Sequence, residues 1–212
     1  KLGDDGAELE QYSDVIIRQT NDLRRIVDEF SKFARMPEPE RRSEDLAKLI
    51  RDVVVLQKEA LDPTQINLSL DLDEIQANID ATMFNQAFTN LIKNAGEAIE
   101  GMAEKPDSFA PEIRVIVTSI EGSTIIEIQD NGMGLPAENR SRLFEPYVTH
   151  RDNGTGLGLP IVKKIIEEHG GTLELFDAPP FDETGRVGAM ARIVLPFGND
   201  LGTVNENIKA AQ

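Results

Sequence analysis

The chain begins with a pattern of apolar positions that is typical of one long helix. Apolar residues recur at alternating steps of three and four over residues 8–35, with a single polar position among them. These positions are Leu9, Tyr12, Ile16, Gln19, Leu23, Ile26, Phe30 and Phe33. Such spacing forms the seam of a coiled coil or a helical bundle. We therefore predict a helix whose apolar side is covered by another helix; the alternative is that it packs on its own domain.

Two prolines end this first pattern and separate it from the rest of the chain. Pro37 and Pro39 disfavour helical backbone in the residues before them, so residues 37–42 (PEPERR) are predicted to be a linker. Apolar residues at helical spacing then predict helices over 43–61, 80–100 and 160–169. Ser43 and Asp80 are the expected N-caps of the first two. His169 is read as a C-terminal residue of the third helix that the helix dipole favours.

Extended patterns lie between these helices. β-branched and alternating runs predict strands over 66–72, 78–79, 112–120, 124–130, 172–177 and 187–196. The Gly-, Asn- and Pro-rich residues 131–158 predict a long loop, and residues 198–212 a polar tail. Because the strands come in pairs with helices between them, we predict an α+β fold, a two-layer α/β sandwich with helices on one face of a mixed sheet.

Composition and charge narrow the possible functions. The 212 residues include 22 Lys and Arg and 38 Asp and Glu, for a net charge of −16, and no Cys. The absence of Cys excludes disulfides, Cys-ligated metals and a thiol nucleophile. The acidity argues against nucleic acid and against an anionic membrane as partners. No apolar run reaches the roughly 20 residues of a membrane span, so we expect a cytoplasmic fragment without membrane contact.

Two asparagines on the second predicted helix are candidate ligand contacts. Asn90 and Asn94 are four residues apart and therefore share a helix face. Carboxamides can orient phosphate oxygens, and an amide oxygen can ligate a hard cation. Taken alone, such a pair is more often solvated or structural.

A carboxylate and two glycines follow the strand that ends at residue 130. Asp130 in the segment Asp-Asn-Gly-Met-Gly-Leu could accept a hydrogen bond from an exocyclic amine such as that of adenine. Gly132 and Gly134 would let the backbone approach a flat ring closely. The alternative is a plain Asp-Asn-Gly turn.

A second glycine-rich segment precedes the third predicted helix. The sequence Gly154-Thr-Gly-Leu-Gly158-Leu can present backbone N–H groups to phosphate, although its spacing does not fit a dinucleotide-binding fold. Residues 140–164 contain five basic and two acidic side chains, opposite in sign to the whole chain. This local excess favours an anion site.

Taken together and in this order, the segments resemble a known family. Asn90–Ala98, Asp130–Leu135, Arg142–Arg151 and Gly154–Leu159 are similar to the N, G1, F and G2 boxes of the catalytic, ATP-binding domain of sensor histidine kinases, in the GHKL ATPase superfamily. The resemblance covers residues 43–197. Residues 1–36 resemble the second helix of the dimerisation and phosphoacceptor hairpin, and the whole is similar to the nitrogen-regulation sensor kinases.

The resemblance implies roles for individual residues. It implies that Asn94 ligates a Mg²⁺ ion that bridges the ATP phosphates, with Asn90 beside it. It implies that Asp130 reads the adenine amine in a pocket shaped by Gly132 and Gly134. Further contacts to the nucleotide are implied for the glycine-rich segment and for an arginine where related kinases often carry Lys, namely Arg151, Gly154, Thr155, Gly156, Leu157 and Gly158.

Asn90 also separates two kinds of chemistry within the superfamily. The resemblance implies that the superfamily's ATPases carry at this position a Glu that activates water, whereas Asn cannot act as a base. We therefore expect transfer of the γ-phosphoryl group to another nucleophile and slow or absent hydrolysis of ATP.

The acceptor histidine of such a kinase is not evident in these residues. The two histidines, His150 and His169, lack the family's acceptor context, so we expect the acceptor upstream of Lys1. The implied partners are ATP, the receiver domain of a response regulator and, in the intact kinase, a second copy in a homodimer. Two alternatives remain: a nucleotide-switched interaction module, and an anti-sigma-type serine kinase, which lacks a dimerising hairpin.

Overall fold

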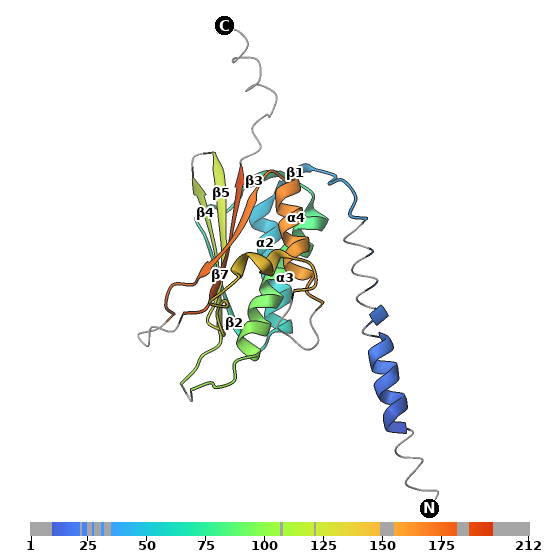
Figure 1. The fold of residues 1–212 in the computed structure, drawn as a ribbon. Helices are drawn as coiled ribbons and strands as arrows, with labels where there is room; N and C mark the ends of the chain where they lie inside the picture. The colour runs from blue at the N-terminus through green and yellow to red at the C-terminus, as the bar shows by residue number, and fades with distance from the viewer. Residues whose placement is uncertain are drawn as a thin grey trace, which may run out of the picture.

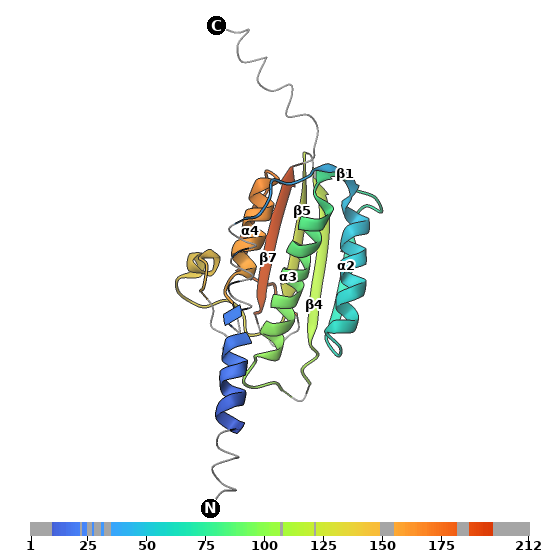
Figure 2. The ribbon, with the colours of Figure 1, turned by 90° about the vertical axis from the view of Figure 1, so that its right-hand side faces the viewer.

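The computed structural model describes residues 10–21, 23–24, 27, 31, 35–106, 108–120, 122–148, 155–181 and 187–196. In the first part of the chain, residues 10–21, 23–24, 27 and 31 are helical, as the seam pattern predicts. Figures 1 and 2 show this helix extending away from the rest of the molecule. The seam residues Tyr12, Ile16 and Leu23 are 58%, 65% and 63% exposed. Leu9, Ile26, Phe30 and Phe33 lie outside the described residues.

The remaining part of the chain is built on a five-stranded sheet with the order β2-β4-β5-β7-β6. Its strands are β2 (Gln65–Leu70), β4 (Glu112–Ile120), β5 (Ser123–Asp130), β6 (Thr172–Asp177) and β7 (Ala189–Pro196). Strands β4, β5, β7 and β6 pair antiparallel with their neighbours, and β2 pairs with β4 in parallel. The sheet is therefore mixed, as predicted.

Three helices cover one face of this sheet. They are α2 (Leu46–Ala60), α3 (Ala81–Glu100) and α4 (Gly158–Glu168), and Figures 1 and 2 show them side by side on the same side of the strands. A short 3₁₀ helix, η1 (Arg140–Phe144), lies within the segment predicted to be a loop. The observed fold is the predicted two-layer α/β sandwich.

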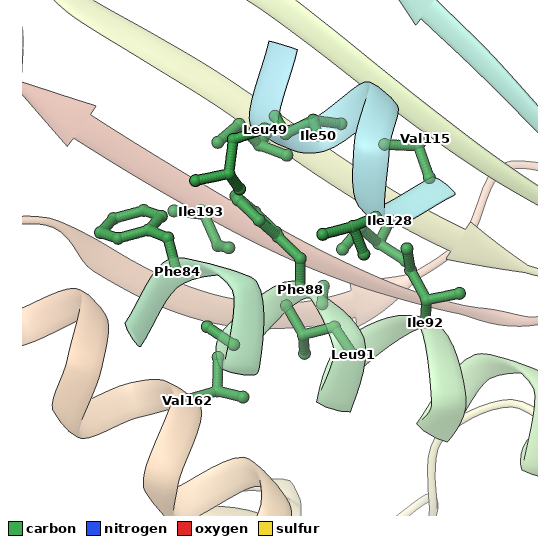
Figure 3. Packing of buried hydrophobic residues seen from close by; sticks show 14 of the residues in the cluster. Leu49, Ile50, Phe84, Phe88, Leu91, Ile92, Val115, Ile128, Val162 and Ile193 are labelled. Atoms are coloured by element: carbon green, nitrogen blue, oxygen red, sulfur yellow. The ribbon is translucent and has the colours of Figure 1, made fainter. Parts of the chain in front are cut away.

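The core lies between the helices and the sheet, and α3 runs through its centre. Figure 3 shows Phe84, Phe88, Leu91 and Ile92 of α3 pointing into this layer. Phe84 and Phe88 are at most 1% exposed, and their ring centroids lie 5.7 Å apart. Because the apolar residues of α3 face the core at helical spacing, its other side is left for polar residues.

The start of the domain differs from the prediction. Ser43 is not an N-cap but part of a strand, β1 (Arg42–Asp45), which pairs antiparallel with β3 (Gln76–Ile79). Helix α2 begins after Asp45, whose carboxylate accepts hydrogen bonds from the N–H groups of Ala47 and Lys48 at 3.0 and 3.3 Å. The pairing with β3 takes residues 43–45 out of the predicted helix, and Arg42, the last residue of the predicted linker, also belongs to this strand.

His169 also has a role different from the one expected from the helix dipole. The residue is 7% exposed, and its ring bridges two helices: Nδ1 donates to Ile165 O at 2.7 Å, and Nε2 accepts from Asp80 N at 3.1 Å. Burial lowers its pKa from the ordinary value of 6.5, although the bond to Ile165 acts in the opposite direction. The imidazole is thus held neutral as a structural bridge, and a favourable cation–dipole interaction does not explain it.

Candidate functional site

One face of α3 supports most of the candidate site. Asn90, Asn94 and Ala98 follow at intervals of four residues, and therefore lie along the same side of the helix. The two asparagines are half-buried, and Ala98 is buried. The other candidate groups meet α3 along this face.

The N-terminus of α4 lies against Asn94. A Cβ atom added to Gly158, the first residue of α4, would lie 3.7 Å from Asn94 Nδ2 and 3.8 Å from its Oδ1. The first N–H groups of a helix have no partner within the helix and attract anions. An amide oxygen suited to a hard cation therefore lies beside N–H groups suited to phosphate.

The residues before α4 fix this helix end. Leu157 is fully buried and anchors the segment in the core. Its N–H group donates to the hydroxyl of Thr155 at 3.5 Å. Gly156 has a positive φ of 66°, and a Cβ there would lie 2.7 Å from the carbonyl carbon of Tyr147. Only glycine suits this close approach in this backbone region.

Asp130 is a buried carboxylate at the end of β5. It is 5% exposed, and its Oδ1 accepts hydrogen bonds from Gly132 N at 2.9 Å and from Ala189 N at 3.4 Å. Burial raises its pKa from 3.8 to about 6, against the opposing effect of these two bonds. Among the described residues, no charged side chain contributes to this shift. Within the part of the chain that the structure describes, this carboxylate has no ionic partner of the kind that a purely structural buried charge normally has.

The glycines after Asp130 bring this segment onto α3. A Cβ on Gly132 would lie 2.5 Å from the carbonyl carbon of Ala98, and Met133 N donates to Ala98 O at 3.1 Å. Gly134 has a φ of 76°. The segment after Asp130 thus contacts α3 at Ala98, on the same helix face as Asn94, which lies one turn before Ala98.

Two members of the predicted set, Arg151 and Gly154, lie outside the described residues, as does His150. The other predicted residues are described, and they gather around α3: Asn90, Asn94, Asp130, Gly132, Gly134, Thr155, Gly156, Leu157 and Gly158.

The prediction of site residues missed Gly188 and Ala189, at the start of β7. Ala189 donates to Asp130, and a Cβ on Gly188 would fall 1.7 Å from the carbonyl oxygen of Asp130. No motif marks these two residues in the sequence. They meet Asp130 because β7 is the neighbour of β5, and strand order is not evident from local pattern.

The local excess of positive charge is smaller than the sequence indicates. The described basic residues of this region form ion pairs with carboxylates, some of which lie outside the 140–164 window. The pairs are Arg140–Asp177 at 2.7 Å, Arg142–Glu145 at 3.3 Å, Lys163–Glu167 at 3.8 Å and Lys164–Glu168 at 3.9 Å. The N–H groups of α4 are consequently the clearest anion-attracting feature of the described site.

The donor set fits Mg²⁺ bound together with phosphate rather than a metal held by protein alone. The described residues contain no group of three or more His, Asp or Glu side chains placed to hold an ion. Mg²⁺ in phosphate-binding sites keeps waters and phosphate oxygens as ligands and needs only one or two protein oxygens. The amide oxygen of Asn94, next to the start of α4, meets that need.

A family model of histidine kinase-, DNA gyrase B- and HSP90-like ATPases matches residues 79–199, more than half of the chain. The matched range holds Asn94, Asp130 and the start of α4. The chain belongs to this family. Its fold is therefore that of a GHKL domain, as the resemblance implies.

Sensor kinases are among the similar proteins. The nitrogen regulation protein NtrY of Azorhizobium caulinodans is 48% identical over 188 residues, which are 88% of this chain and 23% of NtrY. Sporulation kinase A of Bacillus subtilis is 33% identical over 174 residues, 80% of this chain and 27% of that protein. The chain thus spans about a quarter of the length of these relatives.

A solved histidine kinase shares the fold. The structure of full-length ShkA in complex with AMPPNP gives a TM-score of 0.69 at 24% identity, over 90% of this chain and 40% of ShkA. Among the described residues of the present chain, no helix has the length and apolar character needed to cross a membrane.

Proposed function

We propose that this chain is the ATP- and Mg²⁺-binding catalytic core of a two-component sensor histidine kinase of the nitrogen-regulation type. The observation that carries the proposal is the arrangement along α3: Asn94 faces the N-terminus of α4, and one turn further on Ala98 contacts Gly132 and Met133, just after Asp130. Membership of the family and the similarity to NtrY support it.

The base of ATP is assigned to Asp130. Its Oδ1 already accepts two backbone N–H groups, so Oδ2 is the oxygen left to accept from the 6-amino group of adenine. Gly132 and Gly134 carry no side chains and let the ring lie against the backbone. A buried carboxylate of this kind distinguishes an amine from a carbonyl, because a carbonyl oxygen in the same place would face like charge.

The phosphates are assigned to the other end of the same face. Asn94 holds Mg²⁺ through its amide oxygen, and Asn90 orients the phosphate oxygens beside it. The N–H groups of Gly158, the first residue of α4, and of Gly156 just before it meet the phosphate chain, with Gly154, Thr155, Leu157 and Arg151 completing the contacts. When bound there, a Mg²⁺ ion would supply positive charge that offsets the negative charge on the phosphate oxygens.

The reaction is transfer of the γ-phosphoryl group to a histidine. A nitrogen of the acceptor imidazole forms the new P–N bond while the bond from the γ-phosphorus to the β–γ bridging oxygen breaks, and ADP leaves. This chain positions the nucleotide and shields it. Asn90 cannot take a proton from water, so hydrolysis is slow compared with transfer.

The acceptor histidine belongs to another part of the intact kinase, and the partners are separate molecules. The exposed seam residues Tyr12, Ile16 and Leu23 suit a helix that pairs with the acceptor helix and with a second copy. In this proposal the receiver domain of a response regulator takes the phosphoryl group from the acceptor histidine. The intact kinase is anchored to the membrane, and this part of it works in the cytoplasm.

Calorimetric titration with ATP and Mg²⁺ tests the binding site. Asp130→Ala and Asn94→Ala should each weaken ATP binding by about tenfold or more, because each removes a hydrogen bond or metal ligand that has no substitute. Asn85→Ala is the matched control, since Asn85 is exposed on the same helix and lies on the opposite side from Asn94. Equal loss in all three variants would contradict the assignment.

Phosphotransfer tests the activity. The chain alone should not label itself with γ-labelled ATP, but should phosphorylate an added dimerisation hairpin that carries the family's histidine acceptor pattern. The label should be acid-labile. Binding of ATP without transfer would favour the alternative, a nucleotide-switched interaction module, whereas vigorous multiple-turnover hydrolysis would contradict the role given to Asn90.

Oligomeric state tests the role of the first helix. The chain should self-associate through the exposed seam, and Ile16→Asp with Leu23→Asp should shift it toward monomer in light scattering. ATP affinity should not change. The matched control, Arg18→Asp, alters charge on the same helix without removing a seam residue.

A further inference from the structure

The start of β7 packs directly against the main chain of Asp130. A Cβ built on Gly188 would lie 1.7 Å from the carbonyl oxygen of Asp130 and 2.7 Å from its carbonyl carbon. Contacts of real Cβ atoms are essentially never shorter than 3.0 Å. Since the opposing atoms belong to the backbone, they cannot rotate out of the way as a flexible side chain would. Position 188 therefore accepts glycine alone in this arrangement.

Gly188 is also fixed from the opposite side. Ala178, just after β6, donates its N–H group to Gly188 O at 2.9 Å. Ala178 is 3% exposed, so this bond is shielded from water. The peptide of Gly188 is thus confined between β6 and Asp130 and cannot retreat without breaking a buried hydrogen bond.

The next residue makes a polar contact with the same carboxylate. Ala189 N donates to Asp130 Oδ1 at 3.4 Å, and Gly132 N donates to that same oxygen at 2.9 Å. Both donors come from backbone and approach one oxygen. They consequently define the rotation of the carboxylate and leave Oδ2 as the oxygen that points elsewhere.

We infer that Gly188 and the amide of Ala189 are positioning elements that set the direction of Asp130 Oδ2, and through it the selectivity of the site for 6-amino purines. The inference rests on the proposed function, because it concerns the same base-reading carboxylate. Neither residue need touch the nucleotide. A side chain at position 188 displaces the peptide of Asp130, lengthens the bond from Ala189 and turns the carboxylate.

The decisive measurement is a ratio of affinities, which a purely structural role would not change. ATP is compared with the triphosphate of purine riboside, which lacks only the 6-amino group. In the wild-type chain ATP should bind about ten- to a hundredfold more tightly, the value of one hydrogen bond to a charged group. Gly188→Ala should reduce this preference most of the way toward that of Asp130→Ala, and the double variant should lose little more.

Gly171→Ala is the matched control. A Cβ at Gly171 would also meet a backbone oxygen, that of Val194, at 2.7 Å, but far from Asp130, just before β6. Both glycine variants should be less stable than the wild type. Only Gly188→Ala should lose the preference for the amine, whereas Gly171→Ala should keep it.

The outcomes separate this inference from the proposed function. If the wild type and Asp130→Ala show the same ratio, the carboxylate does not read the base, and the proposed function fails at its first step. If the ratio depends on Asp130 but Gly188→Ala keeps the wild-type value, the function stands and the positioning role is wrong.

A second measurement needs no substitution at Gly188. In the wild-type chain the amide proton resonance of Ala189 should shift with pH, together with that of Gly132, because both donate to one ionising carboxylate. Asp130→Asn should abolish both shifts. An Ala189 amide that does not follow the titration would overturn the inference even if Gly188→Ala fails to fold.

Discussion

The two ends of the α3–α4 pair carry buried ionisable groups in opposite situations. At the N-terminal end of α3, Asp80 caps the helix and His169 bridges the two helices, while Arg41 of the linker donates to the C-terminus of α4. At the other end, Asp130 and Asn94 lie along a face of α3 beside the start of α4. The first end, which we call the closed end, is filled by contacts within the protein. The second, the open end, presents polar groups that suit a ligand.

The pKa values of His169 and Asp130 shift in opposite directions. Burial lowers the pKa of His169 and raises the pKa of Asp130 to about 6, so both are pushed toward their neutral forms. The neutral imidazole is the form that makes both of its hydrogen bonds. For Asp130 the charged form is the one that the proposed ligand requires. The protein therefore gains stability from the first group and gives some up at the second, as functional sites commonly do.

The largest effect is expected from removing the packing beneath the closed end. Phe84 is fully buried, and its ring meets that of His169 edge-on at a centroid distance of 4.8 Å. Phe84→Ala should lower the free energy of unfolding by about 3–5 kcal/mol, as measured by urea denaturation. The remaining folded protein should bind ATP with nearly wild-type affinity. A large loss of affinity with little loss of stability would reverse the assignment of the two ends.

The second effect should separate stability from binding at the open end. Asp130→Asn should weaken ATP binding by about ten- to a hundredfold but raise the stability of the unliganded protein at pH 7.5. Because the pKa of Asp130 is higher in the folded state, the wild type loses stability as the pH rises from about 4 to 6, while the unfolded chain alone ionises. The stability advantage of the variant should therefore vanish at pH 3.5.

The fold was largely predictable because it follows from local patterns. The alternation of strands and helices, the cap at Asp80 and the helix end at Gly101 follow from residue types that act over one turn. The strand at residues 42–45 could not be predicted in the same way. It forms because β3, about 30 residues later, pairs with it, and its sequence RSED has the appearance of a helix start.

The site could be predicted where its residues belong to motifs that can be recognised in the sequence. Asn94, Asp130 and Gly158 could be named from the sequence, and the geometry joins them through α3. Gly188 could not, because its importance arises from the pairing of β7 beside β5. The pairing of Arg140 was equally hidden, since Asp177 is its neighbour only in the folded chain, whereas Lys163–Glu167 and Lys164–Glu168 are pairs four residues apart on a predicted helix.

A third effect concerns the bridge at the closed end. His169→Leu keeps apolar volume but leaves the N–H group of Asp80 without its acceptor, which should cost about 1–2 kcal/mol at pH 8. In the wild type, stability should fall as the pH drops below about 6.5, since the unfolded chain then binds a proton that the folded state resists. This part of the pH dependence should be absent from the variant. An unchanged pH profile of unfolding would show that the imidazole is not held neutral.

The smallest effect is expected from an ion pair at the open end that lies on the surface. Arg140 of η1 donates to both carboxylate oxygens of Asp177, at 2.7 and 3.1 Å, where β6 ends. Both side chains are more than a third exposed, so water and salt screen the pair. Asp177→Asn should lower the free energy of unfolding by no more than about 1 kcal/mol, and the difference should shrink in 0.5 M salt. Its ATP affinity should stay within about twofold of the wild type, because the contacts of Ala178 and Gly188 that fix the start of β7 are made by backbone. A loss as large as that of Asp130→Asn would mean that η1, and not β7, holds the open end in place.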